Sequence, residues 1–209
     1  MSALIALEGP AAPLLEPDVN TDSIAPLYRG AGGAAKPGER TQVELARNLF
    51  ANRRFDATGS ETDFVLNRPP FRQAKFVIGG PNFACGSSRE TAATMLSAFG
   101  IRCVIAPSIA GIFFDNCFRN YMLPLVLDDA TVENLGRQAQ TGDAFKLDVE
   151  RGILTPPAGP AIEFALPAFR RELLLSGADE ITVTLKRAER IAAYEAAVKG
   201  RRPWELQPG

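Results

Sequence analysis

Short apolar runs alternate with longer mixed segments through the middle of the chain. Three of these runs have the length of buried strands, and they cover residues 75–78, 102–106 and 123–127. The two segments between them, residues 91–99 and 109–120, predict helices, and Gly100 is suitably placed to end the first one. Strands that alternate with helices in this way predict parallel β-α-β units with right-handed crossovers.

The flanking segments predict smaller elements around this core. Helices are expected at residues 41–52, 128–140, 173–176 and 188–199. Short strands and a turn at Pro156-Pro157 are expected within residues 145–166. Residues 1–17, rich in proline and apolar side chains, are expected to lie against the domain, and the glycine-rich residues 28–40 to form a loop.

The segment with the most candidate functional side chains follows the first of the three apolar runs. Residues 79–90 read GGPNFACGSSRE and join a predicted strand to a predicted helix. The unpaired amides at the start of a helix favour an anion. Arg89 adds a planar guanidinium whose paired N–H groups suit a carboxylate or a phosphate. The sequence therefore predicts a site for a small anionic ligand, with a serine placed to react.

Other kinds of site fit this turn less well. It lacks the G-x-G-x-x-G spacing of dinucleotide-binding loops, the lysine of a phosphate-binding loop and the G-x-S-x-G of a nucleophile elbow. The chain contains no histidine, which excludes a Ser-His-Asp triad built from this chain alone. A simpler alternative is a tight turn in which Ser87 or Ser88 only caps the helix. Two serines, an arginine and a glutamate in succession exceed what a cap needs.

Several motifs along the chain resemble one known family. Residues 82–90 resemble the N-F-G-C-G-S-S-R-E signature of the swivelling domain of the aconitase superfamily. Further motifs follow the order of that family, at residues 18–26 (DVNTDSIAP), 63–67 (DFVLN), 104–113 (VIAPSIAGIF) and 116–124 (NCFRNYMLP). Three further motifs, at residues 168–171, 177–181 and 191–195, resemble in particular the small subunits of 3-isopropylmalate dehydratase (isopropylmalate isomerase). The likeness spans residues 14–197, nearly the whole chain, and is more specific than any single motif.

The resemblance implies a fold and an activity. The fold is α/β, the three-layer swivelling β/β/α domain typical of the aconitase C-terminal domain. It implies one such domain over residues 1–209, with a C-terminal helical extension from about residue 168. The implied activity is that of the small subunit of an iron-sulfur hydro-lyase that dehydrates and rehydrates a substituted malate. The leading case is the isomerisation of 2-isopropylmalate and 3-isopropylmalate in leucine biosynthesis. One alternative is a related diacid such as methylmalate, homoaconitate or dimethylmalate, and another is a non-catalytic anion-binding module.

The resemblance also assigns roles around the turn. Ser87 becomes the base, acting as an alkoxide that needs strong local stabilisation from helix-start amides and Arg89. Ser88, Arg89 and Arg29 are expected to bind substrate carboxylates, with Arg29 reaching from the glycine-rich loop. Simpler interpretations stay open for these three residues: Ser88 as a helix cap, Arg89 in an ion pair with Glu90 or Asp22, and Arg29 facing solvent.

Further residues are expected to support the site without reacting, namely Thr21, Asp22, Asn82, Gly86 and Glu90. Thr21 and Asp22 are expected to shape the loop beneath the ligand, with Asp22 orienting an arginine. The chain departs from the family just after the signature, where Thr91 replaces the usual histidine. This departure leaves the identity of the substrate open.

The composition of the chain limits the kinds of cofactor and partner that it is expected to bind. The formal net charge of −1 does not favour nucleic acid or an anionic membrane. Three cysteines without a C-x-x-C pair argue against a disulfide framework or a metal or cluster site in this chain, and they favour a reduced, cytoplasmic setting. Cys85 is interpreted as a small packed thiol, and Cys103 and Cys117 as core residues. The resemblance then implies that a [4Fe-4S] cluster is carried by a separate large subunit, with which this chain forms a heteromer.

Overall fold

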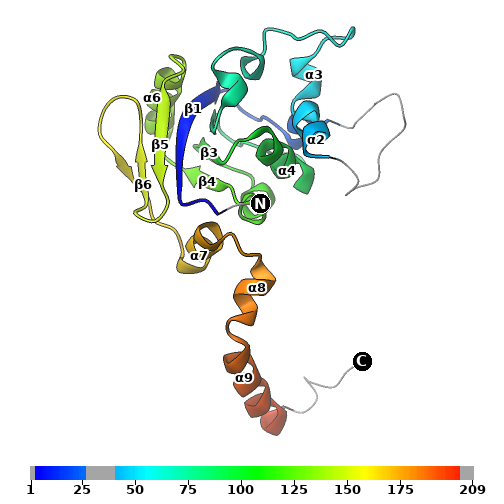
Figure 1. Cartoon of the computed structure of the whole chain (residues 1–209), viewed down its shortest axis with the longest axis vertical. Helices are drawn as coiled ribbons and strands as arrows, with labels where there is room; N and C mark the ends of the chain where they lie inside the picture. The colour runs from blue at the N-terminus through cyan, green and yellow to red at the C-terminus, as the bar shows by residue number, and fades with distance from the viewer. Residues whose placement is uncertain (1–2, 27–40, 203–209) are drawn as a thin grey trace. The chain divides into compact units, whose positions relative to one another are not determined.

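A seven-stranded sheet forms the centre of the fold, in the order β4-β3-β2-β1-β5-β6-β7. The computed structural model describes residues 3–26 and 41–202 (Figure 1). The strands are β1 (Ala6–Leu14), β2 (Phe76–Gly79), β3 (Cys103–Ala106), β4 (Leu123–Val126), β5 (Ala144–Asp148), β6 (Ile153–Thr155) and β7 (Ile162–Glu163). The first four run parallel to one another, and the last three extend the sheet antiparallel on the other side of β1.

The central strand β1 comes from the segment that was expected only to lie against the domain. It pairs parallel with β2 and antiparallel with β5, so it joins the two halves of the sheet. Pro10 and Pro13 lie within it and lack the N–H that a central strand normally donates. The carbonyl of Pro10 still accepts a hydrogen bond from Lys75 N at 2.9 Å. The prolines mask this strand in the sequence, because they argue against a position inside a sheet.

Helices connect and cover the parallel half. The connecting helices α4 (Glu90–Phe99) and α5 (Gly111–Arg119), and α6 (Asp129–Ala139) after β4, confirm the predicted β-α-β pattern to within two residues at each end. α4 stops at Gly100, whose φ of 111° is the left-handed conformation of a terminating glycine. α6 starts after Asp128, whose carboxylate accepts a hydrogen bond from Thr131 N at 2.9 Å.

The single helix predicted over residues 41–52 is interrupted. α2 (Gln42–Asn48) begins at a capping box formed by Thr41 and Glu44. Phe50 has a φ of 49°, which breaks the helical path before the short α3 (Ala51–Arg54). The Phe50 N–H donates to the carbonyl of Ile24 at 2.8 Å, at the end of α1 (Thr21–Ile24). The 3₁₀ turns η1 (Val65–Asn67) and η2 (Phe71–Gln73) then lead into β2.

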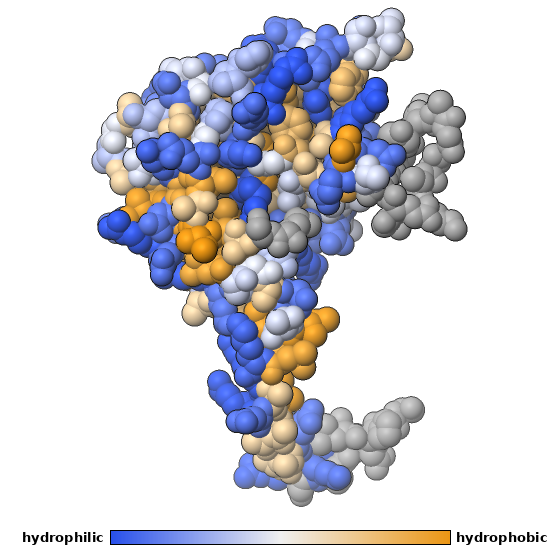
Figure 2. All heavy atoms as spheres, in the orientation of Figure 1, coloured by the Kyte–Doolittle hydropathy of each residue, from blue (hydrophilic) through white to orange (hydrophobic). Residues whose placement is uncertain are grey.

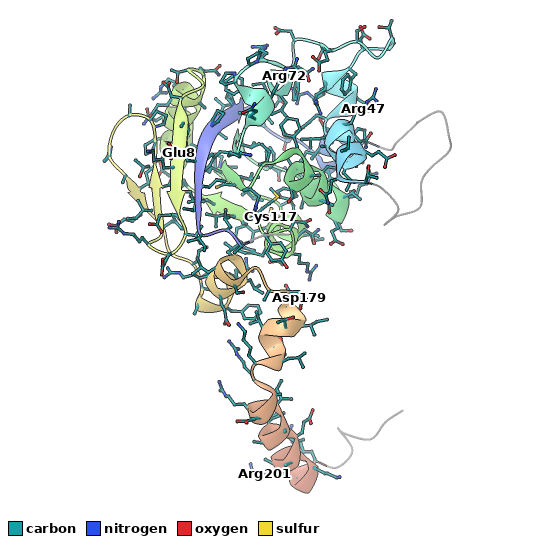
Figure 3. All side chains as sticks on the ribbon, viewed as in Figure 1. Glu8, Arg47, Arg72, Cys117, Asp179 and Arg201 are labelled. Atoms are coloured by element: carbon teal, nitrogen blue, oxygen red, sulfur yellow. The ribbon has the colours of Figure 1, made fainter. Side chains whose placement is uncertain are left out.

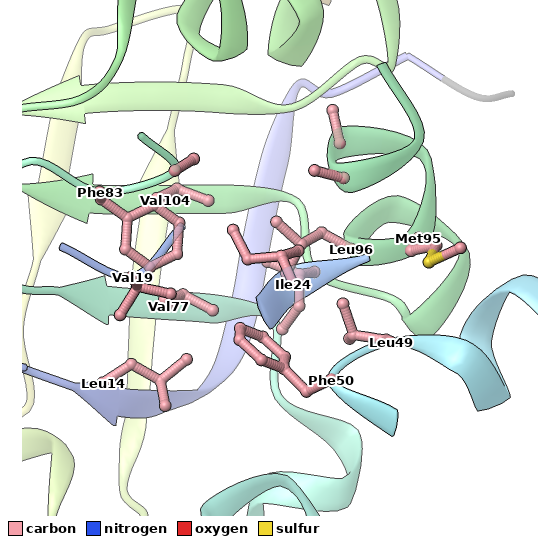
Figure 4. Close-up of a cluster of buried hydrophobic side chains, with 14 of the residues drawn as sticks. Leu14, Val19, Ile24, Leu49, Phe50, Val77, Phe83, Met95, Leu96 and Val104 are labelled. Atoms are coloured by element: carbon pink, nitrogen blue, oxygen red, sulfur yellow. The ribbon is translucent and has the colours of Figure 1, made fainter. Parts of the chain in front are cut away.

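Two hydrophobic clusters fill the two faces of the sheet. Side chains fill the space between the sheet and the helices (Figure 3). The outer surface seen in Figure 2 is mostly hydrophilic. Alternate residues of β2 point to opposite faces, so Val77 joins one cluster while Phe76 and Ile78 join the other. The first cluster includes Leu96 of α4 and Phe83 from the turn after β2 (Figure 4). The turn is therefore anchored in the core.

The chain divides into two compact units, Met1–Gly177 and Ala178–Gly209. The first unit contains the sheet and α7 (Ala168–Ser176), which ends at Gly177 with a φ of 62°. The second contains α8 (Glu180–Leu185) and α9 (Ala188–Arg201). The helices expected at residues 173–176 and 188–199 are thus present and somewhat longer. Across residues 3–26 and 41–202, every helix is too short or too polar to traverse a lipid bilayer.

Candidate active site

The turn between β2 and α4 is held between two other segments. On one side, backbone hydrogen bonds tie residues 81–85 to residues 18–21: Asp18 N to Pro81 O (3.0 Å), Ala84 N to Val19 O (2.6 Å) and Thr21 N to Cys85 O (2.9 Å). On the other side, Phe83 N donates to Ser108 O and Ala110 N donates to Phe83 O, both at 3.0 Å. The turn therefore lies where β1, β2 and β3 all end. Ligands of parallel α/β sheets bind at this carboxyl edge.

Asn82 links the turn to both of its neighbouring segments. Its backbone N–H donates to Ser108 Oγ and its side-chain Nδ2 donates to Asp18 Oδ1, each at 2.7 Å. These are the contacts of a residue that supports the loop, which is the role expected of Asn82. Sequence reasoning does not single out Asp18 or Ser108 as members of the site. The only signal is that both lie inside the motifs that resemble the aconitase superfamily.

Three residues of the turn, Asn82, Ala84 and Gly86, have left-handed backbone conformations. Gly86 has a φ of 100°, and a Cβ placed there would make only ordinary contacts with Asn20 and Thr21. Its backbone conformation, rather than the space around it, therefore calls for glycine. Ala84 has a φ of 59° although it carries a side chain. The family signature has glycine at this position, so the turn here keeps the conformation with a less suitable residue.

Ser87 meets Thr21 across the turn. The two hydroxyl oxygens lie 2.9 Å apart, and the backbone N–H of Ser87 donates to Thr21 Oγ1 at 3.2 Å. Thr21 is 1% exposed, whereas Ser87 is exposed. The reactive candidate thus lies on an exposed residue, and its hydroxyl is held by a buried residue.

Neither serine caps α4. The helix begins at Glu90, and the residue in the cap position is Arg89, which has an extended backbone and makes no side-chain capping hydrogen bond. Ser87 is paired with Thr21 instead, and Ser88 lies exposed before the helix start. This geometry rules out the simpler interpretation of the serines as caps. It also leaves the first-turn amides of a ten-residue helix beside the two serines, where they favour a negative charge.

Arg89 lies between the site and the segment 18–26. It forms an ion pair with Asp22 and donates from Nη1 to the carbonyl of Ala25 at 3.3 Å. Of the two ion-pair partners considered for Arg89, the structure selects Asp22, while Glu90 opens α4 as an acidic first-turn residue. Both contacts of Arg89 use the same terminal nitrogen, Nη1. A guanidinium anchored at one nitrogen can still offer its other N–H groups to a carboxylate.

Arg29, the third residue expected to bind substrate, lies outside the described residues, and its role stays a prediction. The last described residue before it is Pro26. The carbonyl of Pro26 accepts a hydrogen bond from the buried side chain of Asn48 at 3.0 Å. Pro26 is thereby fixed to α2.

The cysteines take no part in this arrangement. Cys103 and Cys117 are fully buried, as expected, and burial raises the pKa of both thiols. Cys85 is half-buried in the turn. Among residues 3–26 and 41–202, no group of three or more cysteine or acidic side chains is arranged to hold a metal ion.

Comparisons with known proteins agree with this fold. The family model for the aconitase C-terminal domain matches residues 37–130, and the model for the C-terminal domain of the 3-isopropylmalate dehydratase small subunit matches residues 180–207. The chain is 46% identical to the 3-isopropylmalate dehydratase small subunit of Rhodospirillum centenum, over 99% of this chain and 100% of the relative. It is 44% identical to that of Paramagnetospirillum magneticum, over 98% of this chain and 100% of the relative.

A solved structure supports the fold independently. The crystal structure of a 3-isopropylmalate dehydratase from Methanocaldococcus jannaschii matches with a TM-score of 0.61 and 24% identity. The match covers 91% of this chain and 99% of that one. The swivelling-domain fold implied by the sequence motifs is therefore confirmed. The full-length relatives and the two family models show that the chain belongs to the 3-isopropylmalate dehydratase small-subunit family of the aconitase superfamily.

Proposed function

We propose that this chain is the small subunit of a hydro-lyase that interconverts 2-isopropylmalate and 3-isopropylmalate in leucine biosynthesis. The observation that carries the proposal is the position of Ser87, an exposed residue whose hydroxyl is held by Thr21, shortly before the start of α4 and two residues before Arg89. The names and full-length similarity of the relatives support the same activity. Dehydration needs a base for the carbon-bound proton and cationic groups for the carboxylates, and this edge of the sheet offers both.

In this proposal Ser87 Oγ takes the proton from substrate carbon and returns it in the reverse addition. An alkoxide is a strong base, and it forms only where its charge is stabilised in advance. The amides at the start of α4 and the guanidinium of Arg89 supply positive potential at that place. Ser88, Arg89 and Arg29 are the residues proposed to hold substrate carboxylates.

We propose that the active enzyme is a heteromer. The relatives are named small subunits, and this chain has no histidine and only three cysteines, two of them buried in the core. The residues of this chain thus do not suit a [4Fe-4S] cluster, which we assign to a large subunit. Such a cluster acts as a Lewis acid for the departing hydroxyl group. A cytoplasmic location is part of the same proposal.

The test is reconstitution with a large subunit from the same source. The complex should convert 3-isopropylmalate to 2-isopropylmalate, while Ser87→Ala should lower kcat by about 10²- to 10⁴-fold with a smaller change in KM. Ser60→Ala, in an exposed turn held by Asp56, makes the same chemical change elsewhere and should leave kcat unaltered.

Three results would contradict the proposal. Near-normal turnover by Ser87→Ala would remove the base assignment. Turnover of methylmalate, homoaconitate or dimethylmalate without any turnover of 3-isopropylmalate would keep the chemistry and replace the substrate. Diacid binding without turnover, in a complex whose cluster content has been verified, would favour the non-catalytic anion-binding alternative.

A further inference from the structure

Thr21 holds Ser87 by a two-point contact. Its Oγ1 lies 2.9 Å from Ser87 Oγ and accepts the Ser87 backbone N–H at 3.2 Å. The side chain of Thr21 is 1% exposed, so bulk water does not compete for this hydroxyl. The two residues are 66 positions apart in the sequence, and the contact joins α1 to the turn before α4.

The backbone fixes Thr21 for this contact. Thr21 N donates to Cys85 O and Thr21 O accepts from Ala25 N, both at 2.9 Å. Gly86, with its φ of 100°, lets the chain turn so that both the N–H and the hydroxyl of Ser87 reach Thr21. The hydroxyl of Thr21 is therefore held in position before any substrate binds.

The proton count decides the direction of the hydroxyl contact. A hydroxyl has one proton to donate and two lone pairs that accept. The Ser87 N–H occupies a lone pair of Thr21 Oγ1, and among the described residues the acceptor that Thr21 Oγ1 meets is Ser87 Oγ. With a neutral Ser87, either hydroxyl can donate to the other. Once Ser87 has lost its proton, only Thr21 can donate, because an alkoxide has no proton to give.

We propose that Thr21 is a positioning residue that donates a hydrogen bond to Ser87 Oγ and stabilises it as an alkoxide. The inference rests on the proposed function, in which Ser87 is the base. A hydrogen bond to a charged oxygen is about twice as strong as one to a neutral oxygen. The contact therefore favours the deprotonated serine over the neutral one. Since substrate binding does not require that deprotonated form, the effect falls on turnover more than on affinity.

A graded series at position 21 in the reconstituted complex tests this inference. Thr21→Val keeps the shape of the side chain and removes the donor, and kcat should fall by about a hundredfold with KM changed by less than about threefold. Thr21→Ser keeps the donor and should restore kcat to within about threefold of wild type. Thr21→Cys supplies a weak S–H donor, and its kcat should fall between those of the serine and valine variants.

A matched control separates the loss of the hydrogen bond to Ser87 from a general loss of stability. Thr62 Oγ1 has the same pattern, since it accepts Phe64 N at 3.3 Å and donates to the carbonyl of Arg53, but it does not contact Ser87. Thr62→Val should lower thermal stability as Thr21→Val does, and it should leave kcat unaltered. If Thr21→Val does not fold, the order of kcat among the threonine, serine and cysteine forms decides.

Two results would overturn the inference while the proposed function stands. One is a kcat of Thr21→Val within threefold of wild type, and the other is a loss for Thr21→Ser as large as that for Thr21→Val. A fully active Ser87→Ala complex would overturn the inference and the base assignment together.

Discussion

Ala84 adopts a backbone conformation that residues with a side chain rarely hold. Its φ is 59°, its side chain is 1% exposed, and its N–H donates to Val19 O at 2.6 Å. The left-handed region costs an L-residue about 1 kcal/mol or more, whereas glycine takes it freely. The greater freedom of glycine in the unfolded chain offsets part of this gain. Ala84→Gly should therefore leave the free energy of unfolding unchanged or raise it by up to about 1 kcal/mol, measured by urea denaturation.

Ala92→Gly is the matched control for this prediction. Ala92 is also fully buried, but it lies inside α4 in a helical conformation. There the same change should lower the free energy of unfolding by about 1 kcal/mol. The difference in sign is the test. If both variants lost stability equally, the backbone of Ala84 would not be strained.

The sequence motifs bring forward residues that contact one another in the structure, but the contacts themselves were only partly predictable. The motifs identify Thr21, Asp22, Ser87 and Arg89 because they stand together in recognisable order. The pairing of Asp22 with Arg89 could be anticipated, since opposite charges in one site attract. The hydrogen bond between Thr21 and Ser87 could not, because two neutral hydroxyls 66 residues apart give no pattern in the sequence.

At the scale of elements, Gly80 marks the place where the chain leaving β2 passes the chain leaving β1. Its N–H donates to Leu14 O at 3.0 Å, and a Cβ at this position would collide with the backbone carbonyl oxygens of Leu15 and Glu16. Backbone atoms cannot move aside as a flexible side chain can. Gly80→Ala should lower the free energy of unfolding by about 3 kcal/mol, as seen in a lower midpoint of chemical denaturation.

Gly111→Ala provides the contrast. Gly111 is the first residue of α5, and no atom lies within 4 Å of a Cβ placed there. Alanine suits a helix better than glycine, so this variant should be as stable as wild type or more stable by up to about 1 kcal/mol. Equal tolerance of Gly80→Ala and Gly111→Ala would show that the two strand ends can separate without loss.

Elements that follow a local pattern were predictable, and those that depend on distant contacts were not. The β-α-β series from β2 to β4 follows from alternating apolar and mixed segments. The centre of the sheet, β1, contains two prolines and becomes a strand because its neighbours on both sides supply partners. Likewise, the break at Phe50 depends on the carbonyl of Ile24, which local spacing cannot reveal.

At the scale of the whole molecule, two hydrophobic clusters lie on opposite faces of the sheet, and the same strands contribute side chains to both. Cys117 of α5 belongs to the cluster that contains Phe50 and Phe83, and Cys103 of β3 belongs to the cluster that contains Phe145. Both clusters lie within the first compact unit. Strands with side chains on both faces link the clusters, so the loss of one should expose the other. The first unit should therefore unfold in a single transition.

The three cysteines make that expectation measurable. Cys85 is half-buried, while Cys103 and Cys117 are fully buried, and burial raises the pKa of both buried thiols, which disfavours the reactive thiolate. A thiol reagent at pH 8 should label only Cys85 in the folded protein. In a Cys85→Ser background, Cys103 and Cys117 should become reactive at the same urea concentration. The labelling of each of the two cysteines is measured separately. Labelling of Cys117 well before Cys103 would mean that the helical face opens while the sheet and its other cluster stay folded.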